Sequence, residues 1–196
     1  MYRIYAFLLG LMLCAGAAHA ASDTPPPAPS HEKLLMAPPA GWKLGYKGRD
    51  KIHALAEFVP ERESVEVWTS LISVQLFYAL GGKSPDKMLL GIDKLAHKFC
   101  RDVFYIRPFK IHENGYDGIV VTQFCTLNSQ SGQGELTTYK IIAGDDRMYV
   151  IHKAWRLPPI ERKTAIERYG DKIKGDLHYL HAVRLCNDQK PGHPCP

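Results

Sequence analysis

Long apolar runs are absent from this sequence after its first twenty residues. No later stretch approaches the roughly 20 apolar residues that a transmembrane helix needs. We therefore expect no stable membrane insertion once the first segment has been removed.

Sequence motifs that carry known chemistry are also missing. There is no Gly-x-Ser-x-Gly elbow, no Walker loop, no Gly-x-Gly-x-x-Gly and no His-Glu-x-x-His. The Gly132-Gln133-Gly134 run is not followed by a predicted helix, so it does not indicate a phosphate cradle. Asp145 and Asp146 lie in a predicted turn, where Asp is common because its side chain bonds the backbone. We predict that the protein is not an enzyme and needs no cofactor.

A concentrated basic stripe, which is typical of nucleic-acid binding, is absent as well. The chain has 25 Lys and Arg against 20 Asp and Glu. Without residues 1–20, which contain only Arg3 among these, the count is 24 against 20, a mild excess of +4. These charges are spread along the chain, so we expect no nucleic-acid partner.

Residues 1–20 have the pattern of a signal peptide. Arg3 gives a positive start, residues 4–14 are almost wholly apolar, and Ala18-His19-Ala20 is a small-x-small cleavage site. A lipid anchor on Cys14 is the alternative, but the residue before it is Leu13 rather than a small one. The pattern predicts export to the periplasm, or secretion.

The rest of the chain divides into two parts. Residues 21–40 are rich in proline and predict an extended linker. Residues 41–196 are long enough for one domain with its own core, and they contain no internal repeat.

Four cysteines remain after the predicted cleavage: Cys100, Cys125, Cys186 and Cys195. An even number in an exported chain indicates two disulfides, for which three pairings are possible. We favour Cys100–Cys125, which ties the end of a helix to a neighbouring strand. We also favour Cys186–Cys195, which closes a short loop near the C-terminus.

Two groups of histidines and cysteines are the alternatives for a metal site. One lies near the C-terminus: His178, His181, Cys186, His193 and Cys195. The other lies on predicted strands: His53, His112 and His152. Three histidines are the right number for a catalytic zinc, provided that they converge. Because no Cys-x-x-Cys is present and isolated strand histidines are usually surface residues, we predict no metal site.

Alternating apolar and polar residues predict seven strands, grouped as sequential hairpins. These segments are residues 42–47, 52–59, 69–77, 103–112, 116–126, 136–143 and 147–155. Asn114-Gly115 is the strongest hairpin signal, and Pro108 predicts an edge or a bulge. This order favours an α+β fold, in which an antiparallel sheet of about six to seven strands carries two main helices.

The two helices are predicted from a 3.6-residue apolar period. The first begins after Ser84, a good N-cap followed by Pro85, and ends near Cys100. Its apolar positions predict one buried face: Met88, Leu89, Ile92, Leu95, Ala96 and Phe99. The second covers about residues 160–179, where Gly170 and Gly175 weaken it.

Three tryptophans are the candidates for a ligand groove: Trp42, Trp68 and Trp155. Aromatic side chains dominate binding pockets, but they also dominate the cores of small domains. Core packing is the simpler interpretation, and the groove is kept as a hypothesis.

Several short motifs together resemble a family of small uncharacterised exported bacterial proteins. They are Gly41-Trp42-Lys43, Glu57-Phe58-Val59-Pro60, Trp68-Thr69, Val74-Gln75, Asn114-Gly115-Tyr116 and residues 140–144. The order of elements is also similar to PsbP-type α/β/α sandwiches. That resemblance implies a binding or assembly factor rather than an enzyme, and no site residue is carried over from it.

The export signal, the cysteines and the missing catalytic motifs favour a non-enzymatic binding or assembly module. Its expected partner is an unidentified envelope or secreted protein. An inhibitor or immunity-type protein is the first alternative, and a small metal-dependent hydrolase is the second.

Overall fold

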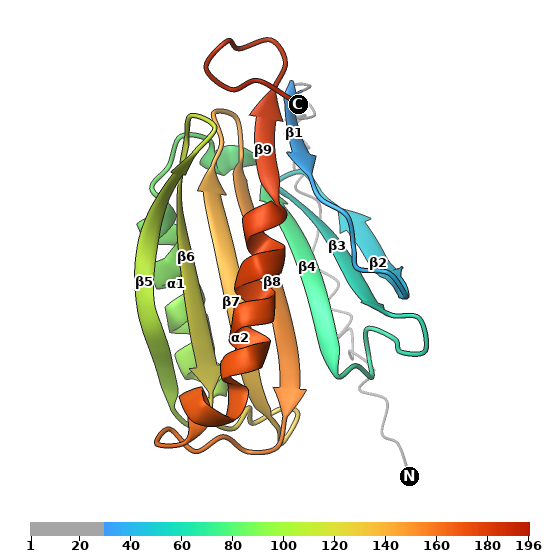
Figure 1. Ribbon diagram of the computed structural model, residues 1–196, viewed down its shortest axis with the longest axis vertical. Helices are drawn as coiled ribbons and strands as arrows, with labels where there is room; N and C mark the ends of the chain where they lie inside the picture. The colour runs from blue at the N-terminus through green and yellow to red at the C-terminus, as the bar shows by residue number, and fades with distance from the viewer. Residues whose placement is uncertain (1–29) are drawn as a thin grey trace, which may run out of the picture.

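The computed structural model describes residues 30–196, so the predicted leader and the first part of the predicted linker lie outside the described residues. The described chain forms three layers, with one helix on each face of a central sheet (Figure 1). The predicted α+β class is confirmed.

The central sheet has seven strands in the order β2-β3-β4-β8-β7-β6-β5, and all neighbouring pairs are antiparallel. The strands are β2 (Trp42–Arg49), β3 (His53–Pro60), β4 (Ser70–Phe77), β5 (Val103–Glu113), β6 (Tyr116–Cys125), β7 (Gly134–Ala143) and β8 (Met148–Leu157). Each corresponds to a predicted segment, because the period of two in their side chains is a local signal.

Strand β5 forms one edge of the sheet and is joined to β6 by a tight turn. Asn114 and Gly115 have φ values of 50° and 80°, a conformation that suits these two residue types. The register of β5 shifts between Ile106 and Phe109, on either side of Pro108. Both features were predicted from the sequence.

Helix α1 (Pro85–Phe99) follows a short 3₁₀ turn (Tyr78–Leu80), and α2 (Ala165–Ala182) follows the last strand of the sheet. The Ser84 hydroxyl accepts a hydrogen bond of 3.2 Å from the Asp86 amide, so it caps α1 as predicted. Helix α2 begins later than predicted, and it continues through Gly170 and Gly175. Within residues 30–196, no helix is long and apolar enough to cross a membrane.

A second, two-stranded sheet pairs the beginning of the described chain with its end. Strand β1 (Glu32–Leu35) is antiparallel to β9 (Arg184–Asn187), and Lys33 forms an ion pair with Asp188. The Glu32 carboxylate accepts a hydrogen bond of 2.6 Å from the Asp145 amide. The segment 32–35 was predicted to be linker, so the folded domain begins before residue 41.

Two disulfides form, with the pairings that the sequence favoured. Cys100–Cys125 joins the end of α1 to the end of β6, and Cys186–Cys195 joins β9 to the C-terminal tail. The first closes a sequence separation of 25 residues and the second one of 9 residues. Both lower the entropy of the unfolded chain and thereby stabilise the fold.

The buried side chain of Lys140 holds the C-terminal end of α2 against the sheet. Its Nζ donates to Glu113 Oε2 at 2.6 Å and to the carbonyl oxygens of Leu180 at 3.2 Å and Val183 at 2.9 Å. Burial lowers the pKa of Lys140, and the hydrogen bond to Glu113 opposes this shift. A cation beside the last carbonyls of a helix is favourable, because these groups carry partial negative charge.

Candidate functional site

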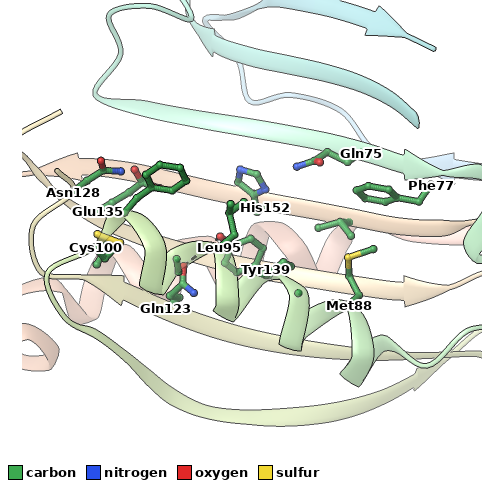
Figure 2. Close-up of a pocket in the computed structure, with 16 residues that line it drawn as sticks. Gln75, Phe77, Met88, Leu95, Cys100, Gln123, Asn128, Glu135, Tyr139 and His152 are labelled. Carbon is green, nitrogen blue, oxygen red and sulfur yellow. Dashed lines mark hydrogen bonds between the residues drawn. A yellow bond between two sulfur atoms is a disulfide. The ribbon is translucent and has the colours of Figure 1, made fainter. Parts of the chain in front are cut away.

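A cavity of about 420 Å³ lies between α1 and the sheet (Figure 2). We call it the α1 cavity. Its helical wall consists of Met88, Gly91, Ile92, Leu95, Ala96 and Phe99. The other lining residues are Gln75, Phe77, Cys100, Gln123, Cys125, Asn128, Glu135, Tyr139, Val150 and His152.

The wall of the cavity is an apolar helix face that the fold buries only in part: Met88, Leu89 and Ile92 pack against a cluster of buried apolar residues of the sheet. None of the side chains of α1 is buried, whereas α2 buries five of its residues. Leu95, which lines the cavity, keeps 59% of its surface exposed. The predicted apolar face of α1 therefore does pack on the sheet, but it is only half-buried, and Leu95 stays largely exposed. Polar side chains of the sheet lie beside this apolar contact, and complete burial under the helix would leave them without partners.

Those polar side chains come from four adjacent strands. Gln75 lies on β4, His152 on β8, Tyr139 on β7 and Gln123 on β6. Figure 2 shows them along the floor, with Met88 and Phe77 toward one end of the cavity. The floor can therefore offer hydrogen bonds to a bound molecule, while the helical wall offers apolar contact.

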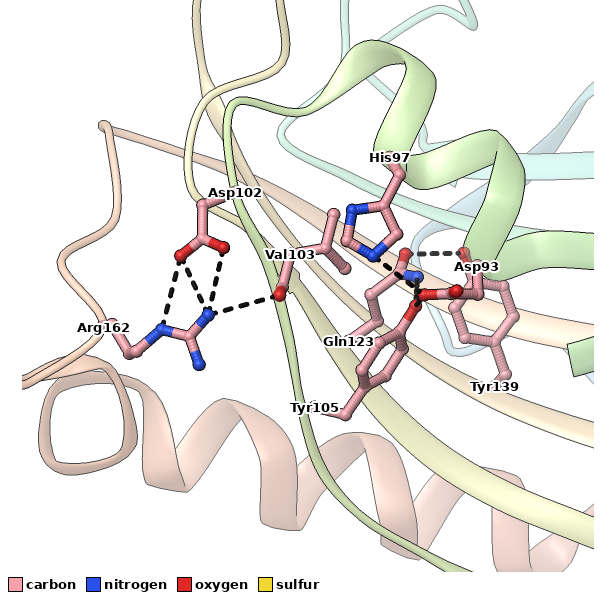
Figure 3. A network of polar contacts seen from close by, with 8 residues as sticks. All are labelled: Asp93, His97, Asp102, Val103, Tyr105, Gln123, Tyr139 and Arg162. Atoms are coloured by element: carbon pink, nitrogen blue, oxygen red, sulfur yellow. Dashed lines mark hydrogen bonds and ion pairs between the residues drawn. The ribbon is translucent and has the colours of Figure 1, made fainter. Parts of the chain in front are cut away.

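A polar network anchors α1 on its β5 side (Figure 3). The Tyr105 hydroxyl donates to Asp93 Oδ1 at 2.6 Å and accepts from Gln123 Nε2 at 2.7 Å. His97 Nε2 lies 3.3 Å from the same Asp93 oxygen, and the Tyr139 hydroxyl lies 3.4 Å from Gln123 Oε1. Burial, together with the bond to Asp93, raises the pKa of Tyr105 to about 12. The hydroxyl therefore stays protonated, and the network fixes the helix along one side of the cavity.

His152 is the floor residue with the least satisfied side chain. Its Nδ1 atom is buried and has no hydrogen-bond partner among residues 30–196. Its ring packs against that of Tyr139, with centroids 5.1 Å apart. Burial lowers the pKa of His152 to about 4, so the imidazole is neutral near pH 7. A neutral imidazole offers one donor and one acceptor to a ligand.

Glu135 is a carboxyl group at the end of the cavity where Figure 2 shows Cys100 and Asn128. Its only hydrogen bond within residues 30–196 comes from the Thr137 hydroxyl, at 3.2 Å. Burial raises the pKa of Glu135; the Thr137 hydrogen bond and the charge of Arg156 oppose this shift.

Arg156 lies opposite Glu135 in the strand register, yet the two side chains do not form an ion pair. The guanidinium group stacks on Trp68, with its carbon 4.0 Å from the ring centroid. Its Nη1 donates to the Glu66 carbonyl at 3.2 Å. Arg156 is therefore held outside the α1 cavity, in a polar hollow of about 340 Å³ that shares Asn128 and Glu135 with it.

The structure does not bring the three strand histidines together. His53 lies on β3 and contacts Gln75, while His112 lies on the edge strand β5 and pairs with Asp117. Four strands separate β3 from β5, so these histidines are about 24 Å apart at the usual strand spacing. The hydrolase alternative required that either these histidines or the C-terminal group converge, and this geometry contradicts the first of the two sites.

The C-terminal group does not form a metal site either. Cys186 and Cys195 are joined to each other, and His193 stacks on Tyr116, with ring centroids 4.2 Å apart. Its Nδ1 lies 2.9 Å from the Asn114 carbonyl. Among residues 30–196, no group of three or more His, Cys, Asp or Glu is placed to hold a metal ion.

The three tryptophans lie on two sides of the sheet rather than in one groove. On the α2 side, the ammonium group of Lys153 lies 6.0 Å from the ring centroid of Trp42 and 5.0 Å from that of Trp155. Asp176 accepts hydrogen bonds there from Trp155 at 2.9 Å and forms an ion pair with Lys153 at 3.1 Å. Trp68 contacts Arg156, whose side chain alternates to the opposite face.

The α1 cavity was not predicted from the sequence. Glu135, Gln75 and Gln123 belong to no motif, and His152 was considered only as a metal ligand. One signal was available: residues 135, 137 and 139 place three polar side chains on the same face of β7. That pattern is typical of a sheet face that is not packed as a dry core.

Comparisons with known proteins show the fold. No protein-family model matches the chain, and no curated protein matches it. The solved structure of the Saccharomyces cerevisiae Ran-binding protein Mog1p has a TM-score of 0.50 at 12% identity, covering 78% of this chain and 94% of that one. A Mog1 mutant has a TM-score of 0.49 at 13% identity, over 78% and 95% of the two chains. A protein of unknown function from Pseudomonas aeruginosa has a TM-score of 0.42 at 10% identity, over 74% and 93%.

Proposed function

We propose that this protein is a non-enzymatic binding module that holds a small, largely apolar molecule in the α1 cavity. The observation that carries the proposal is the apolar face of α1, which lines the cavity and is only half-buried by the fold. A volume of about 420 Å³ lies within the range of ligand pockets, roughly 300–1,000 Å³. Burial of apolar ligand surface against this wall would supply the affinity.

The fold is compatible with a binding role. Mog1p, which shares it, is a Ran-binding protein. At 12% identity the likeness carries over the architecture alone, so the ligand of this chain must be argued from its own residues.

We further propose that the protein works in the periplasm or after secretion, and that an envelope or secreted protein delivers or receives the ligand. The two disulfides support this location, since such bonds persist in oxidising compartments. Cell fractionation with N-terminal sequencing tests it. We expect a mature chain that starts at Ala21 in the periplasmic fraction, and a full-length cytoplasmic chain with free thiols would contradict it.

A cavity-blocking variant tests the ligand site. Gly91 lines the α1 cavity in the middle of α1, and a Cβ atom added there meets nothing within 4 Å. Gly91→Leu would fill part of the cavity without straining the helix. Gly91→Ala is the matched control, because it makes the same gain in helix propensity, about 1 kcal/mol, with little bulk.

Binding is measured with N-phenyl-1-naphthylamine, an uncharged apolar probe that fluoresces in apolar sites. We expect the wild type and Gly91→Ala to bind it alike, and Gly91→Leu to bind at least tenfold more weakly. Thermal unfolding would verify that both variants are folded. Equal binding by Gly91→Leu, or no binding by the wild type, would show that the α1 cavity is not the ligand site.

A further inference from the structure

We infer that the ligand of the α1 cavity is a hydrophobic amine, with its apolar body along α1 and its ammonium group beside Glu135. The inference rests on the proposed function and names the chemical class of the ligand. It is carried by the charges that line the cavity and by their positions.

Among residues 30–196, Glu135 is the only Asp, Glu, Lys or Arg that lines the α1 cavity. Its carboxyl group receives one hydrogen bond from Thr137, and no cation of residues 30–196 forms an ion pair with it. The Arg156 guanidinium, its cross-strand neighbour, is instead held by Trp68 and by the Glu66 carbonyl. The carboxylate therefore forms no direct ion pair, although the nearby charge of Arg156 opposes the rise in its pKa that burial causes.

A bound ammonium group would provide a direct ion-pair partner. Burial disfavours an ionised carboxylate unless it is paired, and it raises the pKa of Glu135 here. An ammonium group offers three donors and a positive charge, whereas a carboxylate ligand would place two like charges at one end of the cavity. The floor residue His152 is neutral near pH 7 and does not repel a cation.

The shape of the site sets the apolar part of the ligand. The helical wall from Met88 to Phe99 spans about 16 Å at the rise of an α-helix, which suits an extended chain of about ten carbons. Leu95 and Ile92 lie between these ends and contact such a chain along its length. Glu135 lies at the end of the cavity opposite Met88 (Figure 2).

The test compares three probes with the same chain and different head groups: decylamine, 1-decanol and decanoate, each below its micellar concentration at pH 7. Each displaces N-phenyl-1-naphthylamine from the full chain. We expect decylamine to displace it at a concentration at least tenfold lower than decanoate, with 1-decanol between the two. In Glu135→Gln the preference for decylamine over 1-decanol should disappear, while 1-decanol binding stays unchanged. Glu161→Gln removes an exposed acid outside the cavity and should leave the preference intact.

The outcomes separate this inference from the proposed function. If 1-decanol and the fluorescent probe both fail to bind the wild type, the ligand site itself is refuted. If 1-decanol binds the wild type and decylamine binds no more tightly, the inference of an amine ligand is refuted and the ligand site itself is not. This outcome needs no variant. A preference that survives in a folded Glu135→Gln would also overturn the role of Glu135.

Discussion

Replacing His152 by glutamine should change how the stability of the protein depends on pH. The pKa of this histidine is about 4 in the fold because of burial, against about 6.5 in an unfolded chain. Between these values the unfolded state binds more protons, so the wild type loses stability as the pH falls from 6.5 toward 4. A difference of 2.5 pKa units corresponds to at most about 3 kcal/mol, at 1.36 kcal/mol per unit. Glutamine does not titrate, so His152→Gln should lack this loss.

The measurement is urea unfolding, followed by tryptophan fluorescence, at pH 7.0, 6.0, 5.0 and 4.5. The free energy of unfolding of the variant is compared with that of the wild type at each pH. Glu135, in the same cavity, and Asp176, on the other face, also titrate with raised pKa values, but they are common to both proteins. Near pH 7 the difference in the free energy of unfolding measures the packing lost in the variant. Toward pH 4.5 the variant should gain stability relative to the wild type. A difference that stays constant over this range would refute the assignment of a buried, neutral imidazole.

Three further predictions concern the stability of the fold, each measured by denaturant unfolding. Replacing Cys100 and Cys125 by serine should cost about 3.5 kcal/mol, the loop entropy for a separation of 25 residues; a loss below 1 kcal/mol would contradict this. Lys140→Met should cost about 3 kcal/mol, because the 1%-exposed ammonium group is the donor for the carbonyl end of α2, and an unchanged midpoint would refute that role. Asp176→Leu should cost about 3 kcal/mol in the wild type but much less beside Lys153→Met, because the first change alone leaves a buried ammonium group unpaired; equal costs would show that the pair is not coupled.

The elements that the sequence predicted well depend on local signals. Strand alternation, the Asn114-Gly115 turn and the Ser84-Pro85 start of α1 are each contained within a few residues. The disulfide pairing followed from the expected neighbourhood of a helix end and a strand. These features could be predicted without knowing which distant parts of the chain are in contact.

The features that were missed depend on distant contacts. Strands β1 and β9 have four residues each and pair across most of the domain, so neither has a periodic signal of its own. The apolar stripe of α1 is a strong local pattern, and it correctly predicts a helix. It does not reveal that Gln75, Gln123 and His152 lie beneath it, because those residues come from three separate strands. The α1 cavity follows from that conflict between an apolar wall and a polar floor.

The disulfide between Cys100 and Cys125 affects when the α1 cavity is complete during the maturation of the chain. Both residues line the end of the α1 cavity, and the bond fastens the last turn of the helix to the floor. In a newly made chain that still carries two thiols there, the last turn of α1 would lose this covalent link, and the helix would be held by non-covalent contacts such as Tyr105–Asp93 and the packing of Met88 and Ile92. If the α1 cavity is the ligand site proposed above, oxidation of these two cysteines would precede tight ligand binding, and the reduced chain would bind the ligand more weakly.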